Sequence, residues 1–210
     1  MVASDAQPST ETRPQPRTAH SERVLASVLL PAASIIRKRG ILGASVEELV
    51  EAVGVTKGTL YYHVRTKEGL LFRIHESVTN EGYERWLKVI EETKGQPAST
   101  TLRRMIEEHC AVIRDYRDCV AVISEEMKYL SADMQDEIRQ WRADYQALLE
   151  SVLERGVDDG EFVVASIHQT ASIMIGMLNS MYRWYSPDGP MSVSELADTA
   201  TELLLLGLRG

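Results

Sequence analysis

The chain has little of what several kinds of protein chemistry require. Among its 210 residues there are only two cysteines and two phenylalanines, and aromatic residues make up 6% of the whole. Cys110 and Cys119 do not form a CxxC pair, so neither a disulfide framework nor a cysteine zinc site is expected. We interpret both as reduced thiols in the core of an intracellular protein.

Long hydrophobic runs are also absent. The densest run, LLLLGL at residues 203–208, is far shorter than the roughly 20 residues that a membrane-spanning helix needs. The first residues contain no apolar segment of the kind found in secretory signals. These features predict a cytoplasmic protein without a membrane partner.

Motifs of the common enzyme classes are missing as well. The sequence contains no GxSxG, HExxH or GxGxxG motif and no Walker loop. Its histidines are scattered along the chain. His109 could share a metal ion with Glu125 or Glu126 inside a helical bundle, but acidic pairs of this kind are more typical of solvated helix faces. We therefore predict a protein that is not an enzyme, with no catalytic residue, no metal site and no cofactor.

The net charge of −8 is distributed unevenly. Residues 21–80 carry 8 basic and 6 acidic side chains, whereas residues 81–210 carry 13 basic and 23 acidic ones. An acidic C-terminal part does not exclude a polyanionic partner, but it restricts that partner to the N-terminal part.

Composition and periodicity together divide the chain into three parts. Residues 1–20 are rich in Pro, Ser and Thr and predict a disordered tail. Residues 21–80 predict a small helical domain and residues 81–210 a larger one, so the expected fold class is all-α. In the first helix, from Ser21 to Arg39, Pro31 either produces a kink or begins a second helix in its first turn.

The segment SVEELVEAV at residues 45–53 predicts a short capped helix. Ser45 and Glu48 form an S-x-x-E capping box. Gly54 then provides a tight turn, and a new helix begins at Thr56. Two short helices joined in this way form a helix-turn-helix pattern, which we place at residues 45–64.

The second of these helices, TKGTLYYHV at residues 56–64, is unusually rich in hydrogen-bonding groups and rings. Leu60 and Val64 lie one turn apart and are expected to face the core, which leaves most of the polar side chains outside. Rings and hydroxyls of this kind reach base edges and phosphates in a major groove. The alternative is that Tyr61 and Tyr62 pack between helices. We predict DNA contacts by Ser45, Thr56, Lys57, Thr59, Tyr61, Tyr62, His63 and Lys67.

The stretch SVEELVEAVGVTKGTLYYHVRTKEGLLFRI resembles the DNA-binding domain of the TetR family of bacterial transcriptional regulators. The shared pattern is a capped second helix, then Gly-Val-Thr-x-Gly-Thr-Leu-Tyr-x-His, then a Lys-Glu pair that opens the fourth helix. The resemblance implies an N-terminal three-helix DNA-binding domain and a C-terminal helical domain that binds an effector and forms a homodimer. Such a dimer suits double-stranded operator DNA with paired half-sites.

In the C-terminal part, turn signals predict one helix from Ser99 to about Tyr116 and a further one over residues 124–129. Longer helices are expected over residues 131–155, 166–185 and 192–208. The last of these begins at a second capping box, formed by Ser192 and Glu195. The final two helices carry apolar stripes, which the resemblance assigns to the dimer interface.

The segment NSMYRWYSPDGPMSVSELADTATELLLLGL is similar to the C-terminal end of TetR-type regulators that respond to acyl-CoA thioesters. This resemblance implies a repressor that a small lipophilic effector releases from its operator, with no cofactor. The alternative is a repressor of an efflux pump that senses a drug or an aromatic compound. The predicted ligand-binding residues are Met105, His109, Trp141, Tyr145, Met174, Leu178, Asn179 and Arg183.

Overall fold

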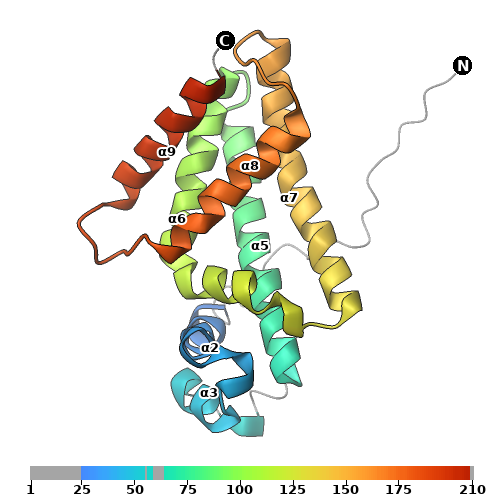
Figure 1. Ribbon diagram of the computed structural model, residues 1–210, viewed down its shortest axis with the longest axis vertical. Coiled ribbons are helices and arrows are strands. Elements are labelled where there is room, and N and C mark those ends of the chain that lie inside the picture. Colours follow the sequence, from blue (N-terminus) through green and yellow to red (C-terminus); the bar gives the residue numbers. More distant parts are fainter. Residues whose placement is uncertain (1–24, 55, 59–63, 209–210) are drawn as a thin grey trace, which may run out of the picture.

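The computed structural model describes residues 25–54, 56–58 and 64–208, and within these ranges the chain is all-helical (Figure 1). The predicted all-α fold class is confirmed. A π-helical turn, Leu25–Leu29, leads into α2, Leu30–Gly43, and α3, Val46–Val53. The larger part is built from α5, Lys67–Glu92; α6, Ala98–Glu125; α7, Ala132–Asp158; α8, Ile167–Ser180; and α9, Val193–Leu208. The predicted tail at residues 1–20 lies outside the described residues.

Pro31 lies in the first turn of α2, directly after the π-helical turn. The backbone of Leu29 is itself helical, with φ −77° and ψ −36°, so the π-helical turn runs directly into α2. Pro31 thus follows a change from π-helical to α-helical geometry, which lies between the two expectations of a kink and of a separate helix start. Gly40 interrupts the helical geometry with a φ of 71°, a conformation that glycine adopts without strain.

The N-terminal capping of α3 is as predicted. The Ser45 hydroxyl accepts a hydrogen bond from the Glu48 backbone N–H at 3.1 Å, and the Glu48 carboxylate accepts one from the Ser45 N–H at 2.9 Å. Gly54 ends the helix in the left-handed conformation. Val64 is buried, as expected of the following helix, whereas Leu60 lies outside the described residues.

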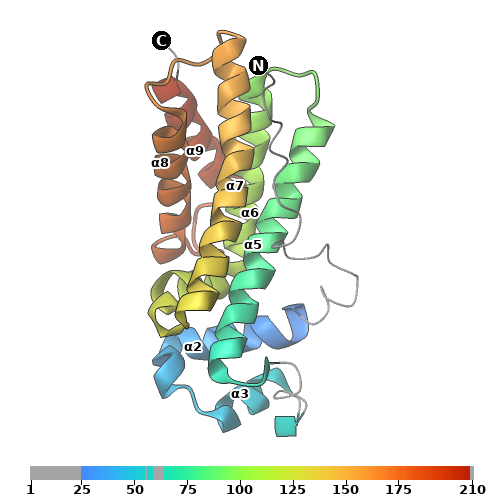
Figure 2. The same cartoon turned by 90° about the vertical axis from the view of Figure 1, so that its right-hand side faces the viewer.

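Helix α5 begins at a Thr66 cap, whose hydroxyl accepts a hydrogen bond from the Gly69 N–H at 2.9 Å. The helix continues without a break to Glu92 and so spans residue 80, where the sequence predicts the domain division. The division itself stays a prediction. One rigid helix thus connects the helix-turn-helix region to the larger bundle (Figure 2).

The predicted separation of residues 99–116 from 124–129 is wrong. Helix α6 is continuous from Ala98 to Glu125, with a kink at Tyr116, and only a short 3₁₀ turn, Met127–Tyr129, follows it. Nor is Ser99 the N-cap. The Glu161 carboxylate accepts hydrogen bonds from the Ala98 and Ser99 N–H groups at 2.6 and 3.0 Å, so a distant residue caps this helix.

The remaining helices agree with the sequence to within a few residues. Helix α7 ends at Asp158 rather than Arg155, and the 166–185 helix is α8 followed by a 3₁₀ turn, Met181–Arg183. The second capping box is present, since the Glu195 N–H donates to the Ser192 hydroxyl at 3.2 Å and the Ser192 N–H to the Glu195 carboxylate at 2.7 Å. No helix among the described residues is long and apolar enough to cross a membrane.

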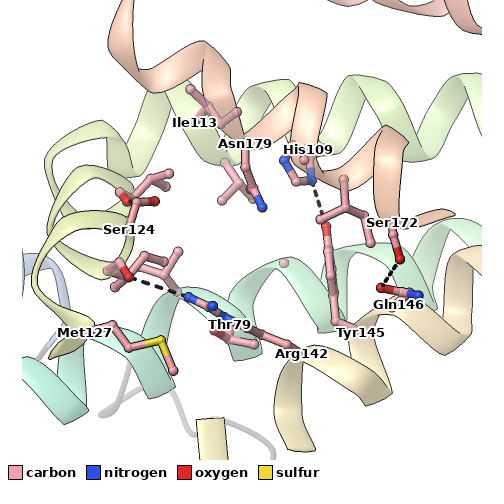
Figure 3. A pocket seen from close by; sticks show the side chains of 17 residues that line it. Thr79, His109, Ile113, Ser124, Met127, Arg142, Tyr145, Gln146, Ser172 and Asn179 are labelled. Atoms are coloured by element: carbon pink, nitrogen blue, oxygen red, sulfur yellow. Dashed lines mark hydrogen bonds between the residues drawn. The ribbon is translucent and has the colours of Figure 1, made fainter. Parts of the chain in front are cut away.

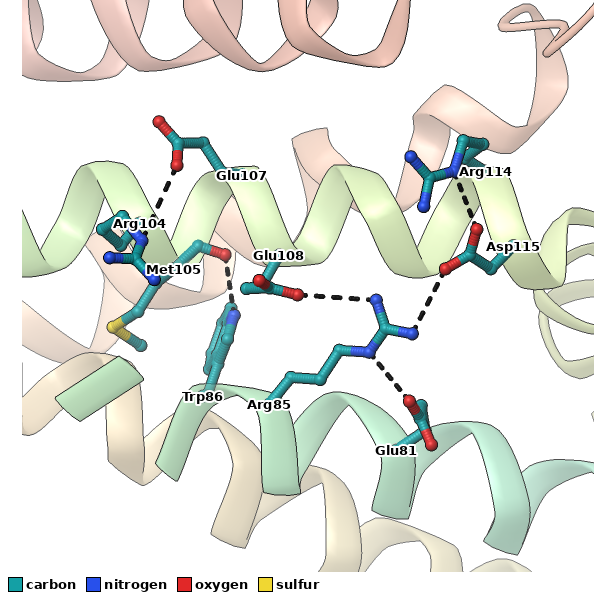
Figure 4. Close-up of polar contacts among 9 residues, drawn as sticks. All are labelled: Glu81, Arg85, Trp86, Arg104, Met105, Glu107, Glu108, Arg114 and Asp115. Carbon is teal, nitrogen blue, oxygen red and sulfur yellow. Dashed lines mark hydrogen bonds and ion pairs between the residues drawn. The ribbon is translucent and has the colours of Figure 1, made fainter. Parts of the chain in front are cut away.

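An arginine on α5 joins that helix to α6 (Figure 4). The Arg85 guanidinium donates to Glu81 on its own helix at 2.8 Å, and to Glu108 and Asp115 on α6 at 3.4 and 3.2 Å. Because three carboxylates surround one guanidinium, this network fixes the axial register of the two helices. The register matters because both helices form the cavity described next.

Candidate functional site

A cavity of about 440 Å³ lies inside the larger helical part, between α5, α6, α7 and α8 (Figure 3). Its volume falls in the range of small-molecule sites. Its wall mixes aliphatic and polar side chains. The lining residues are Val78, Thr79, Gly82, His109, Val112, Ile113, Val120, Ile123, Ser124, Met127, Arg142, Tyr145, Gln146, Ser172, Ile175, Gly176 and Asn179.

At one side of the cavity, an aromatic stack supports a polar pair. The Tyr145 ring stacks on Trp86 with 3.9 Å between centroids, and its hydroxyl is 2.9 Å from His109 Nδ1. The Trp86 indole N–H donates to the Met105 carbonyl at 2.8 Å, which anchors the stack on α6. Gly82 packs against the Tyr145 ring, where a Cβ would lie 3.4 Å from it, in ordinary van der Waals contact.

Burial keeps this polar pair uncharged. It lowers the pKa of His109 to about 4, against a smaller opposing effect of the Asn179 side chain. It also raises the pKa of Tyr145 well above its ordinary value. Both groups are therefore neutral near pH 7, and they can offer hydrogen bonds to a ligand without carrying a charge.

Arg142 on α7 brings a positive charge to the cavity. Its guanidinium makes one hydrogen bond, to the Ile123 carbonyl at 3.5 Å, and no described carboxylate pairs with it. Burial lowers its pKa from the ordinary value, although part of the side chain reaches solvent. The nearby His75 adds no charge, because burial and Arg142 lower its pKa to about 3.

The structure brings three of the eight predicted ligand-binding residues into the cavity wall: His109, Tyr145 and Asn179. The other five do not line it. Met105 is fully buried beneath the Trp86 stack, and Trp141 packs on Phe72 with 5.1 Å between centroids. Met174 and Leu178 lie on the buried face of α8, and the Arg183 guanidinium donates to the Tyr182 hydroxyl at 3.1 Å.

Several lining residues were not among the predicted ones, and Arg142 is the most informative of them. Helical spacing offered a usable signal, because Arg142, Tyr145 and Gln146 follow one another at i, i+3 and i+4 on one face of α7. The α8 residues Ser172, Gly176 and Asn179 follow one another at i, i+4 and i+7, which also places them on one helix face. Nothing in their residue types separates them from ordinary surface positions.

The predicted DNA-contact residues are described only in part. Thr56 and Lys57 are exposed at the start of the second helix of the motif, where Lys57 Nζ lies 3.2 Å from Glu47. The Ser45 hydroxyl serves as the cap of α3, and Lys67 Nζ lies 3.5 Å from the Ile41 carbonyl. The other predicted contacts, Thr59, Tyr61, Tyr62 and His63, lie outside the described residues.

One segment touches both the cavity and the helix-turn-helix region. After the kink at Tyr116, the end of α6 contributes Val120, Ile123 and Ser124 to the cavity wall. The same segment forms an ion pair between Asp118 and Arg37 of α2. We call residues 117–126 the link segment.

A second contact of the link segment holds α2 one turn further along. The Ile41 N–H donates to the Glu126 carboxylate at 3.1 Å. Nearby, the Ser131 N–H donates to Glu68 at 2.7 Å, which ties the start of α5 to the start of α7. A displacement of the link segment therefore has a direct path to α2.

The last two helices leave an apolar surface uncovered. Both α8 and α9 pack on α6 with one face. On their other faces, Ile173 is 70% exposed, Leu203 61% and Leu206 62%. Singly exposed apolar residues are common, and these three make α8 and α9 the candidates for a contact surface.

The fold defines a helix-turn-helix transcriptional regulator, with a small N-terminal DNA-binding unit on a larger helical body. Comparison with known families agrees. Residues 29–74 match the family of bacterial regulatory proteins called tetR, and residues 95–208 match the tetracyclin repressor-like C-terminal domain. The chain belongs to the TetR family of bacterial transcriptional regulators, as its sequence motif predicts.

Individual relatives support the same assignment. The chain is 24% identical to the HTH-type transcriptional repressor KstR2 of Rhodococcus jostii (strain RHA1), over 84% of this chain and 87% of that one. The TetR family regulator PfmR from Thermus thermophilus has a similar structure, with a TM-score of 0.78 and 28% identity over 87% of this chain and 99% of that one. AibR, solved in complex with isovaleryl coenzyme A and operator DNA, gives a TM-score of 0.74 and 25% identity over 86% and 97%.

Proposed function

We propose that this regulator is a homodimeric repressor that an acyl-CoA thioester releases from its operator. The observation that carries the proposal is the composition of the cavity. Aliphatic side chains from α5, α6 and α8 line it, and Arg142 supplies a positive charge that no described carboxylate neutralises. An apolar chamber suits an acyl chain, and a guanidinium at a partly solvent-exposed position suits an anionic group of coenzyme A.

The alternative effector, a drug or aromatic compound of an efflux system, fits the cavity less well. Such a ligand favours aromatic walls and needs no anion site. Apart from the His109 imidazole, Tyr145 is the only aromatic side chain among the described lining residues. AibR, whose structure was solved with isovaleryl coenzyme A, supports the acyl-CoA class by similarity.

The link segment offers a physical route from effector to DNA. A ligand that fills the cavity contacts Val120, Ile123 and Ser124, and their segment holds α2 through Asp118 and Glu126. If the ligand favours a different position of this segment, α2 and the helix-turn-helix motif move with it. The effector then shifts the population toward a dimer in which the distance between the two helix-turn-helix motifs no longer matches the spacing of the operator half-sites.

Operator recognition falls to the motif at residues 45–64. Lys57 and Lys67 stand at helix starts, where backbone N–H groups also favour a phosphate. Thr59, Tyr61, Tyr62 and His63 are proposed to read base edges in the major groove. Dimerisation through α8 and α9 places two such motifs on paired half-sites.

Native mass spectrometry of the purified protein with a panel of acyl-CoA esters tests the effector class. The expected spectrum shows a dimer carrying one or two acyl-CoA molecules, with free coenzyme A as the control that binds more weakly. A dimer that remains free of adducts across the panel contradicts the acyl-CoA assignment. That result favours the efflux-type alternative and leaves the family assignment in place.

A further inference from the structure

One buried nitrogen atom in the cavity wall, Nε2 of His109, has a hydrogen-bonding capacity that no described residue satisfies. His109 is 5% exposed, and its Nε2 atom has no partner at hydrogen-bond geometry among the described residues, although the Asn179 side chain lies close enough to raise the pKa of the ring slightly. Buried polar atoms in native proteins seldom lack a hydrogen-bond partner. Because His109 lines the cavity, a ligand in that cavity can supply the missing partner.

The neighbouring groups determine which kind of partner fits. Tyr145 keeps its proton, and a phenol hydroxyl donates to imidazole more readily than it accepts from it. The Tyr145 O–H therefore donates to Nδ1 across 2.9 Å, which leaves the proton of the neutral ring on Nε2. Nε2 is then a donor and needs an acceptor oxygen.

A second donor lies beside it. The Asn179 side chain, from α8, points into the cavity beside the His109 ring (Figure 3). When its N–H₂ group faces the cavity, the amide donates to the same oxygen atom that receives the Nε2 proton. Two neutral donors that converge on one point form a site for an uncharged carbonyl oxygen, whereas the charge of Arg142 serves the anionic group of the ligand.

We propose that His109 and Asn179, oriented by Tyr145, bind a carbonyl oxygen of the effector. The oxygen belongs either to the thioester itself or to a keto group on the acyl chain. This inference rests on the proposed acyl-CoA function and adds to it a preference between ligands of equal size. A hydrocarbon chain alone fills the cavity but leaves Nε2 unpaired.

Three ligands of matched length test the preference by calorimetric titration: octanoyl-CoA, S-octyl-CoA, which has a methylene in place of the carbonyl, and β-ketooctanoyl-CoA. If the thioester carbonyl is bound, octanoyl-CoA binds about tenfold more tightly than S-octyl-CoA. If a chain carbonyl is bound, the β-keto ester is the one that gains about tenfold. In His109→Leu either preference falls to near unity.

Two further variants separate recognition from folding. Tyr145→Phe keeps the stack on Trp86 and removes the hydroxyl that fixes the tautomer, so it weakens the preference while the protein stays folded. His168→Leu removes an exposed histidine that does not line the cavity and keeps the full preference. In ¹⁵N-histidine spectra, the Nε2 signal of His109 should shift when the carbonyl ligand binds.

The outcomes distinguish this inference from the function on which it rests. Equal binding of all three coenzyme A ligands by the wild type, or a preference that survives in His109→Leu, overturns the carbonyl site and leaves the acyl-CoA function intact. If no coenzyme A ligand binds but cyclohexanone shifts the His109 signal, the carbonyl site stands and the acyl-CoA function fails. If neither kind of probe binds, both are wrong.

Discussion

Replacing Leu203 and Leu206 by aspartate is expected to produce a folded monomer whose operator affinity is lower by a factor of about 100 or more. Both side chains are more than half exposed on α9, so their loss removes little of the monomer core. In a two-fold dimer each charge would be buried against its apolar counterpart without a partner. The large effect on DNA follows because two half-sites can no longer be bound together.

Sedimentation velocity and a DNA-binding titration measure the two consequences separately. Leu42→Asp serves as a control for association, because Leu42 is 73% exposed but lies at the end of α2, in the N-terminal part. This control should stay dimeric. A Leu203/Leu206 variant that remains a dimer, with an unchanged circular dichroism spectrum, would place the interface elsewhere.

Arg142→Gln is expected to lower acyl-CoA affinity by roughly 10- to 100-fold, the loss typical of hydrogen bonds to a charged group. Operator affinity without ligand should change little, since Arg142 is exposed, makes one long hydrogen bond to the Ile123 carbonyl of the link segment and has no described contact with α2 or α3. The wild-type affinity should also fall as the salt concentration rises, and this dependence should be weaker in the variant.

Arg139→Gln provides the matched control for this experiment. Arg139 lies on the same helix one turn earlier, is exposed and pairs with Asp136, and does not line the cavity. Its replacement should leave ligand affinity and salt dependence as they are. If Arg142→Gln binds acyl-CoA as tightly as the wild type, the anion site is assigned to the wrong residue.

The sequence predicted local features well where a few neighbouring residues determine them. The capping box at Ser45 and Glu48 and the left-handed turn at Gly54 depend on hydrogen bonds within one turn of helix, and both are present. The start of α6 is different, because its cap is Glu161, which lies far away in the chain. The kink of α6 at Tyr116 involves neither proline nor glycine, so the sequence has no signal that the helix bends there and continues.

The cavity was harder to predict because it depends on how four helices rotate against one another. Met105 and His109 lie one turn apart on α6, yet His109 reaches the cavity while Met105 packs beneath Trp86. Residue type favoured methionines and Trp141 as ligand contacts, whereas packing placed them in the core or against Phe72. By residue type alone Arg142 does not differ from a solvated arginine. Only the structure shows that no described carboxylate pairs with it.

The central claim, release from DNA by an acyl-CoA, is tested most directly by fluorescence anisotropy. The wild-type protein is bound to a labelled duplex that it has itself selected from random sequences, and acyl-CoA esters of increasing chain length are added. The anisotropy is expected to fall to the value of free DNA with at least one ester, and not with coenzyme A alone. Anisotropy that stays at the bound value with every ester, at concentrations shown to saturate the protein, would contradict it.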